Sequence, residues 1–387
     1  MDLITAPVRT GIMGKLAQLL PQPGGENLFR PDFLSINITS SCVASCEHCC
    51  ESHNSGRYEP MSTAEVSDIL RQAADQIPPA QRRIFHIWGG EPFLDTNKLF
   101  AAVHEADKYG FSAIRITTNG FWGKDRKGAK DILQWLSGST TKTEIILEIS
   151  CDNMHNDQDQ LKVEYLANIT SLTEESFRGR ISYDINSLWL SDRKSLRDLA
   201  KAMSRVDPFG RDIKFGESPS GMEAMLLAVN EDEELEWMRH IVFILPSVKR
   251  YEPGMDKYFG MRTLNPEDMK WAMRPINYHQ AVIGIDRQFY INLHFCSIGA
   301  LRMGSIREYS MAQLMGRVDV DPVAVSLMKC GYSEIYPQLK AISRGTHGSF
   351  DVDRWLTQFY DYADMLQGLE SDEPVLALHP TKRRKAA

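Results

Sequence analysis

Four of the seven cysteines lie within the segment 42–50, and three of them have a spacing suited to an iron–sulfur cluster. Cys42, Cys46 and Cys49 are separated by three and then two residues. Such a short loop can wrap three thiolates around one face of a cubane cluster, each bound to a different iron. Because a cluster normally takes four protein ligands, three would leave one iron open to bind and orient a small molecule.

Two other uses of these cysteines are open. Cys50 could act as a fourth ligand and make the cluster an electron carrier, although adjacent side chains in an extended loop point apart. Alternatively, the thiols could hold zinc together with His48 or His53. Zinc sites of that kind usually have a second pair of ligands farther along the chain, which this sequence lacks at a regular spacing.

Other residues that could bind a small molecule stand directly after predicted strands. The run Gly89, Gly90, Glu91 and Pro92 combines two glycines, which let a ligand approach the backbone, with a carboxylate that can accept hydrogen bonds from an ammonium group. Asn119 lies in a tight turn. Ser150 and Asp152 could bind hydroxyl groups, although Asp152 could equally cap the next helix.

An alternation of strands and helices would bring these residues together. Strand patterns occupy Phe33–Ile38, Arg83–Trp88, Ala113–Thr118, Ile145–Ser150, Arg180–Ile185 and Asp212–Phe215. Helical patterns follow a capping box at Ser62 and Glu65 and recur at Thr96–Tyr109, Lys127–Leu136 and Arg193–Ser204. This order is typical of a parallel sheet wrapped by helices. Six units fall short of a complete barrel, so we expect an α/β fold, a partial (β/α)6 barrel, with its chemistry on the loops after the strands.

The cysteine spacing after the first strand, together with these turns, resembles the radical S-adenosylmethionine superfamily over residues 33–216. The resemblance implies a [4Fe–4S] cluster on Cys42, Cys46 and Cys49 and S-adenosylmethionine (AdoMet) as the second cofactor. It implies that the GGEP turn holds the amino group of the methionine moiety. The predicted cofactor-binding residues are Gly89, Gly90, Glu91, Pro92, Asn119, Ser150, Asp152 and His48.

The second half of the chain changes pattern near Ala281. Alternating apolar runs around Asp286–Arg287 predict a hairpin, and helical patterns follow from Met311 and at Val352–Leu366. This region is similar to the start of the SPASM or Twitch extension of the superfamily, which holds auxiliary clusters. Only Cys296 and Cys330 occur here, so we expect the scaffold without a second cluster. The alternative is one cluster completed by Cys151 or by ligands other than cysteine.

The predicted organisation follows from these patterns. It comprises an N-terminal segment (1–32), the barrel core (33–217), an irregular substrate-proximal segment (218–280), a smaller α+β extension (281–369) and a polar tail (370–387). Cys151 and Cys296 are candidate catalytic hydrogen donors to a substrate radical, as cysteine thiols are in some epimerases of the superfamily. The alternative is that both are small buried hydrophobic residues.

The resemblance implies an enzyme in which the reduced cluster cleaves AdoMet to a 5′-deoxyadenosyl radical that takes hydrogen from the substrate. We expect a peptide or natural product as substrate, with a small metabolite such as an aminoglycoside or amino acid as the alternative. A flavodoxin- or ferredoxin-type protein would supply the electron. A non-enzymatic iron–sulfur or zinc carrier is the alternative of another class, but a carrier has no need of the GGEP turn.

Composition limits the other possibilities. The 387 residues are 43% hydrophobic and 25% charged, as in ordinary globular proteins, and the net charge of -7 argues against a general nucleic-acid-binding surface. The basic run at 382–385 is interpreted as a solvated tail. No uncharged apolar run is long enough for a bilayer, and the start lacks the pattern of a secretory signal. Clustered cysteines then favour a reducing, cytoplasmic location.

Overall fold

The computed structural model describes most of the barrel region and parts of the segments around it. The described residues are 11–24, 28–46, 58–78, 83–152, 155, 161–188, 193–217, 224–230, 232, 234–244, 279–292, 301–331, 333, 335, 337 and 338. His48, Cys49, Cys50, Cys296 and the helix expected at 352–366 lie outside them. Within these ranges no helix combines the length and apolar character needed to cross a membrane.

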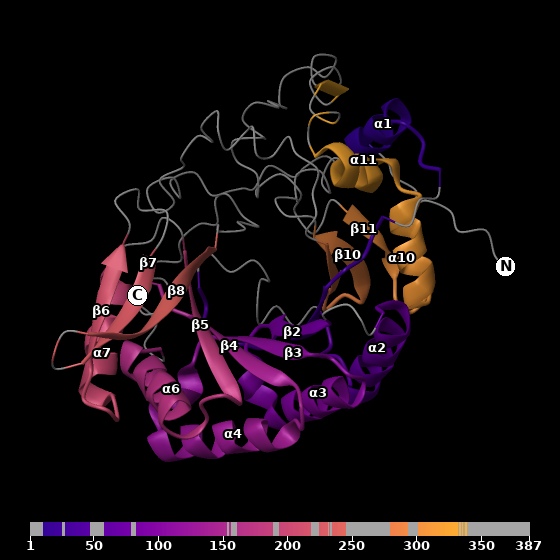
Figure 1. Cartoon of the computed structure of the whole chain (residues 1–387). Coiled ribbons are helices and arrows are strands. Elements are labelled where there is room, and N and C mark those ends of the chain that lie inside the picture. The colour runs from indigo at the N-terminus through magenta and orange to yellow at the C-terminus, as the bar shows by residue number, and fades with distance from the viewer. Residues whose placement is uncertain are drawn as a thin grey trace, which may run out of the picture.

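Six neighbouring strands of one sheet run parallel to each other. They are β1 (Phe33–Thr39), β2 (Ile84–Gly89), β3 (Ala113–Thr118), β4 (Glu144–Ser150), β5 (Ile181–Leu188) and β8 (Leu235–Ile244). Figure 1 shows the sheet curved into an open arc, with the connecting helices on its convex side. The structure therefore confirms the predicted partial (β/α)6 barrel.

The helices follow the strands in the expected order. They are α1 (Gly11–Leu19), α2 (Thr63–Gln76), α3 (Thr96–Lys108), α4 (Arg126–Ser139), α6 (Val163–Ser176) and α7 (Lys194–Val206), with short 3-10 turns at Pro92–Asp95 and Phe121–Lys124. The capping box of Ser62 and Glu65 at the start of α2 is confirmed. Asp95 and Asp125 cap α3 and α4 in the same way, each accepting from backbone N–H groups of the first turn.

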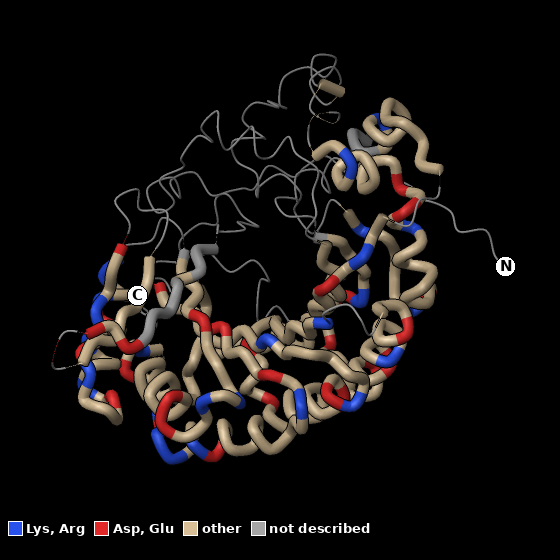
Figure 2. The backbone as a smooth tube through the Cα atoms, in the orientation of Figure 1, with Lys and Arg blue, Asp and Glu red and all other residues tan. Residues whose placement is uncertain are grey.

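Each parallel strand presents alternate residues to opposite faces of the sheet. The residues that face the helices are apolar and fully buried in one core, among them Ile87, Ile116, Leu147 and Ile185. Charged residues are found on the strands as well as on the helices, and acidic and basic positions interleave along the outer helices (Figure 2). The other face of the strands, which forms the barrel interior, carries a small apolar cluster of Ile84, Ala113 and Ile146 as well as polar residues such as His86 and Glu148.

The sixth parallel strand is not the one expected from the sequence. Residues 212–215 belong to β6 (Asp212–Glu217), which lies at the edge of the sheet and runs antiparallel to β7 (Ala224–Val229). The strand that pairs with β5 is β8, reached through the β6–β7–β8 meander. The segment 218–280, predicted to be irregular, thus contains two strands. Antiparallel strands can be joined by a hairpin without a helix between them. A prediction based on alternating strands and helices therefore misses these two strands.

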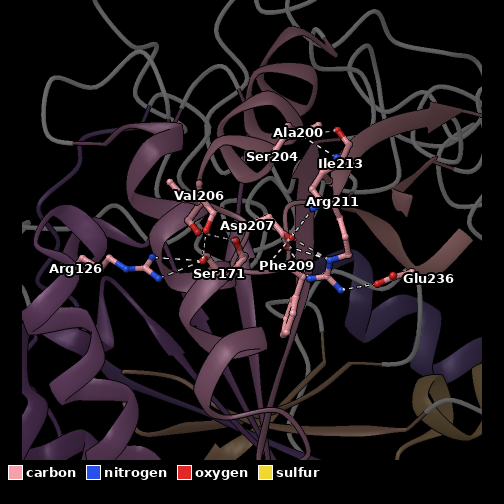
Figure 3. A network of polar contacts seen from close by, with 12 residues as sticks. Arg126, Ser171, Ala200, Ser204, Val206, Asp207, Phe209, Arg211, Ile213 and Glu236 are labelled. Atoms are coloured by element: carbon pink, nitrogen blue, oxygen red, sulfur yellow. Dashed lines mark hydrogen bonds and ion pairs between the residues drawn. The ribbon is translucent and has the colours of Figure 1, made fainter. Parts of the chain in front are cut away.

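A network of polar contacts attaches this meander to the helices (Figure 3). Asp207 and Arg211 form an almost fully buried ion pair with an Oδ1–Nη2 distance of 2.7 Å. Arg211 also reaches Glu236 on β8, with Nη1 3.4 Å from Oε2. Ser171 of α6 donates to the carbonyl oxygen of Val206 at 2.7 Å. These contacts hold the turn between α7 and β6 against both α6 and β8.

The extension continues the same sheet beyond β1. The predicted hairpin is confirmed as β9 (Gln280–Ile283) and β10 (Gln288–Asn292), with Arg287 in the turn at a φ of 62°. It is followed by β11 (Arg302–Ser305), α10 (Met311–Asp319) and α11 (Pro322–Cys330). Strand β9 pairs in parallel with β1. The extension is therefore joined to the barrel core by backbone hydrogen bonds.

Candidate active site

The loop after β1 carries the first two of the predicted cluster ligands. Cys42 and Cys46 are both partly buried. The hydroxyl oxygen of Thr39 accepts from the N–H of Ser41 at 3.1 Å, and the N–H of Ala44 lies 3.4 Å from the Cys42 sulfur. The loop therefore turns back on itself with an N–H group directed at a cysteine sulfur, as around metal-bound thiolates.

The GGEP turn after β2 lies directly against this loop. Gly90 donates its N–H to Thr39 O at 2.7 Å, and Glu91 donates to Ser41 O at 2.8 Å. A Cβ added at Gly90 would lie 2.0 Å from Ser41 O, far inside any contact distance. At this position the glycine admits the backbone of the cysteine loop, whereas the sequence analysis assigned both glycines to the approach of a ligand.

Glu91 joins the turn to the loop after β3. Its side chain is fully buried. The carboxylate accepts from Phe93 N at 3.1 Å, from Thr118 Oγ1 at 2.9 Å and from Asn119 N at 2.7 Å. These protein donors occupy both oxygens, so the carboxylate holds two active-site loops together. The contact of the turn with the methionine amino group stays a prediction.

Burial of Glu91 predicts a pH effect on stability. Desolvation raises the pKa of this carboxyl from 4.5 to about 7, although its hydrogen bonds act in the other direction. Because the folded state then holds the proton more tightly than the unfolded state, this group stabilises the fold fully below about pH 4.5 and loses that contribution as the pH rises through about 7. The loss is at most about 3 kcal/mol.

The measurement compares the free energy of unfolding of the wild type and of Glu91→Gln between pH 5 and pH 8. The variant does not titrate at this position, so its stability should fall less over this range than that of the wild type. Parallel profiles for the two proteins would show that Glu91 keeps an ordinary pKa in the folded state.

Asn119 connects the loop after β3 to the first cysteine. Its amide Nδ2 lies 3.6 Å from the Cys42 sulfur, within hydrogen-bond range for sulfur. Its Oδ1 accepts from Phe121 N at 3.1 Å, which fixes the orientation of the amide with the NH2 group toward the sulfur. The side chain is 7% exposed. Asn119, which is predicted to bind a cofactor, therefore lies beside a predicted cluster ligand.

The loop after β4 approaches the second cysteine. Asp152 accepts from the backbone N–H of His155 at 3.0 Å, the contact of a helix cap, and its other oxygen lies 2.7 Å from His155 Nδ1. Burial would lower the pKa of His155, but Asp152 and a hydrogen bond with the Cys46 thiol raise it well above its usual value. His155, which sequence reasoning leaves out of the site, is thus in contact with a predicted ligand.

The remaining cysteines are placed differently. Cys151 is fully buried in the core, and its sulfur lies 3.7 Å from Ser195 O. This position is the one expected if Cys151 is a small buried hydrophobic residue. The role of Cys151 as a hydrogen donor stays a prediction. Cys330 is the last residue of α11 and is partly buried. Ser150 is the last residue of β4, and it pairs in register with Asn186 of β5.

The barrel interior contains a polar network that joins side chains of β1 to β5. Arg115 of β3 bridges Glu148 of β4 and Asp184 of β5, with 2.7 Å between its Nη2 and Asp184 Oδ2. His86 of β2 lies 3.2 Å from Glu148 and 2.8 Å from the hydroxyl of Ser35 on β1. We call the side chains of Ser35, His86, Arg115, Thr117, Glu148 and Asp184 the inner-face network. Single polar or charged residues within otherwise apolar strands, such as His86, Arg115 and Glu148, are the signal that could have revealed it.

The predicted site residues therefore gather at the carboxyl ends of neighbouring strands. The structure brings together Cys42, Cys46, Gly89, Gly90, Glu91, Asn119 and Asp152. Two cysteine sulfurs on one loop, each contacted by a polar side chain from another loop, suit a thiolate-bound cluster. Among the described residues no group of three or more His, Cys, Asp or Glu side chains is placed to hold a metal, and the third expected ligand, Cys49, lies outside them.

No family model matches the chain. A segment of 124 residues is 31% identical to the putative peptide biosynthesis protein YydG of Bacillus subtilis (strain 168), which corresponds to 32% of this chain and 36% of that protein. The match thus spans about a third of the length of the curated relative.

Solved structures resemble the chain at low identity. Native anSMEcpe with bound AdoMet is 14% identical over 81% of this chain and 99% of that one, with a TM-score of 0.47. SuiB of Streptococcus suis bound to S-adenosylmethionine is 13% identical over 84% and 76% of the two chains, with a TM-score of 0.48. The cysteine spacing, the turn motifs and the strand order remain the features in which this chain resembles the radical S-adenosylmethionine superfamily.

Proposed function

We propose that the chain is a radical S-adenosylmethionine enzyme with one [4Fe–4S] cluster on Cys42, Cys46 and Cys49. The observation that carries the proposal is the joining of the cysteine loop to three other strand ends. Gly90 and Glu91 bond to its backbone, Asn119 contacts Cys42, and His155 contacts Cys46. A carrier protein needs only the ligands, whereas this arrangement builds a site around them.

The chain's own residues would bind and orient the cofactors. When bound, the cluster supplies the electron that splits AdoMet into methionine and a 5′-deoxyadenosyl radical, which takes hydrogen from the substrate. The GGEP turn would hold the methionine amino group, and Ser150 would bind the ribose at the end of β4. Asp152 combines a predicted ribose contact with the observed contact to His155. An external flavodoxin- or ferredoxin-type protein would provide the electron.

A peptide or related natural product is the proposed substrate. The support is the sequence similarity to YydG, a putative peptide biosynthesis protein. The parallel strands also present polar residues to the barrel interior, where an orienting site for a polar substrate belongs.

The test of the proposed function is AdoMet cleavage. The anaerobically purified protein with its cluster, reduced with dithionite, should convert AdoMet into 5′-deoxyadenosine and methionine, both quantified by mass spectrometry. The same protein without reductant is the control. A reduced protein that carries a full cluster and forms no 5′-deoxyadenosine would contradict the proposal and favour a carrier.

Asn119 should influence the reduction of the cluster. An amide N–H directed at a ligating sulfur stabilises the added negative charge, so its loss should make the cluster harder to reduce. We expect Asn119→Leu to shift the reduction equilibrium about tenfold, a potential about 59 mV more negative. A redox titration followed by electron paramagnetic resonance measures it.

A second variant separates charge from size at this position. Asn119→Asp keeps the shape but replaces the N–H donor by a negative charge, and it should shift the potential further in the same direction. Wild-type potentials in both variants, with a full complement of iron, would show that the contact between Asn119 and Cys42 has no electrostatic role.

A further inference from the structure

Two polar atoms on the strands of the barrel have no hydrogen-bond partner among the described residues although they are buried. They are the indole Nε1 of Trp88 on β2 and the amide Oδ1 of Asn186 on β5. Asn186 as a whole is only 5% exposed. Buried polar groups are nearly always paired, because an unpaired one loses its contact with water and gains nothing. A donor and an acceptor left unpaired in one interior therefore point to a ligand.

Both atoms lie beside the inner-face network. Trp88 follows His86 by two residues on β2, so both side chains are on the same face, and the two rings stack with centroids 6.4 Å apart. Asn186 follows Asp184 by two residues on β5, again on the same face. The network contacts run from β2 across β3 and β4 to β5. One connected polar surface thus carries both unpaired atoms.

Asp184 adds a second acceptor to this surface. Its Oδ2 is held by Arg115, its side chain is 32% exposed, and its Oδ1 has no hydrogen bond or ion pair with a described residue. Glu148, by contrast, is bound by Arg115, His86 and Thr117. The negative charges of Glu148 and Asp184 face Arg115, so the surface has no uncompensated Lys or Arg among the described residues that would attract an anionic ligand.

We propose that Trp88, Asp184 and Asn186 bind amide groups of the substrate, which makes the substrate a peptide that is neutral or cationic where it enters the barrel. The indole N–H donates to a peptide carbonyl, and Asn186 Oδ1 and Asp184 Oδ1 accept peptide or side-chain N–H groups. A peptide backbone offers one donor and one acceptor per residue, the complement of this set. This inference rests on the proposed function and names its substrate class.

The inner-face network positions these groups before a ligand arrives. Arg115 fixes one oxygen of Asp184 and so restricts the rotation of this carboxylate. The stacking of His86 on Trp88 restricts the indole ring. A site built on strands and supported by ion pairs loses little freedom when it binds its ligand.

The first test needs no substrate, because a binding role and a structural role have opposite effects on stability. Asn186→Leu removes a polar atom that has no partner, so the ligand-free protein should keep or gain thermal stability. Trp88→Phe removes the indole N–H but also part of a ring that stacks on His86, so its melting temperature should fall by no more than this truncation costs. Thr118→Val is the control, since its hydroxyl is paired with Glu91, and its melting temperature should fall. A loss of stability in Asn186→Leu as large as that in Thr118→Val would show that the amide oxygen is paired in the fold and would overturn the proposal.

The second test measures binding to the cluster-loaded protein with AdoMet. The probe is a pool of randomised octapeptides, acetylated and amidated at the ends, and mass spectrometry quantifies what the protein retains. The wild type should retain these peptides but should not retain a pool of the same composition whose backbone amides are N-methylated. Trp88→Phe and Asn186→Leu should each retain several-fold less, with AdoMet affinity unchanged. Ser182→Ala, on the same strand and bonded to Glu144, is the control and should bind like the wild type.

Three results would overturn the proposal. In the first, both variants retain the peptides as well as the wild type does. In the second, the wild type retains an aminocyclitol and not the peptides. In the third, the variants lose affinity for AdoMet, which would assign both atoms to cofactor binding. A wild type that binds peptides but does not cleave AdoMet would contradict the proposed function and leave this site intact, so the two failures are distinguishable.

Discussion

Replacing Cys42, Cys46 and Cys49 together by alanine is expected to reduce iron from about four atoms per chain to near zero and to abolish AdoMet cleavage. The thiolates are the predicted ligands of the cluster. Two of the three side chains lie on one loop at the barrel end, with polar partners already directed at them. Without these ligands no electron reaches AdoMet, so the effect on the rate should be complete.

Iron analysis and electron paramagnetic resonance of anaerobically purified protein measure this outcome. Cys330→Ala is the control, because Cys330 lies at the end of α11, and this variant should keep the full iron content. Retention of about four irons by the triple variant would contradict the ligand assignment. About eight irons in the wild type would show that the extension holds an auxiliary cluster after all. Zinc in place of iron would favour the zinc alternative.

Gly90→Ala is expected to lower the free energy of unfolding by about 3 kcal/mol, the upper end of the usual cost of adding a methyl group to a tightly packed position. It is also expected to lower the iron content of the protein. The added Cβ would lie 2.0 Å from Ser41 O, and backbone cannot move aside as a flexible side chain can. Moving the cysteine loop would also break the bonds from Gly90 N to Thr39 O and from Glu91 N to Ser41 O. The geometry around Cys42 should change with it.

Gly138→Ala provides a matched control for this substitution. Gly138 lies in α4, and an added Cβ would meet nothing within 4 Å. Because alanine favours a helix over glycine, this variant should gain about 0.5–1 kcal/mol. Chemical denaturation of both variants gives the comparison. Equal stability of the two proteins would show that the loop after β1 accommodates the Cβ without cost.

The part of the fold that could be predicted depends on local patterns. Apolar alternation identified five of the six parallel strands, and the capping box of Ser62 and Glu65 located the start of α2. The turn at Asp286–Arg287 identified the hairpin of the extension. These features involve residues close together in the chain, so residue propensities and hydrophobic periodicity are enough to predict them. The sixth strand required a pairing between β5 and β8 across a meander, which no local pattern encodes.

The same distinction holds for the site. The motifs placed Cys42, Glu91, Asn119 and Asp152 at strand ends, and a parallel barrel brings successive strand ends together. The sequence could not show that Glu91 directs its carboxylate at Thr118 and Asn119, because those contacts join separate βα units. It could not show that Asn119 lies beside Cys42 either, since 77 residues separate them.

By itself, then, the sequence determined the chemistry available to this protein: three closely spaced thiols, a glycine-rich turn with a carboxylate, and the alternation that builds a partial barrel. Only the tertiary structure decided which groups are already paired and which are not. Glu91 accepts hydrogen bonds from three groups of its own protein, whereas Trp88 Nε1 and Asn186 Oδ1 are buried without partners among the described residues. The reason is physical: residue type sets what a group can donate or accept, but pairing and burial arise from strands brought together by the fold.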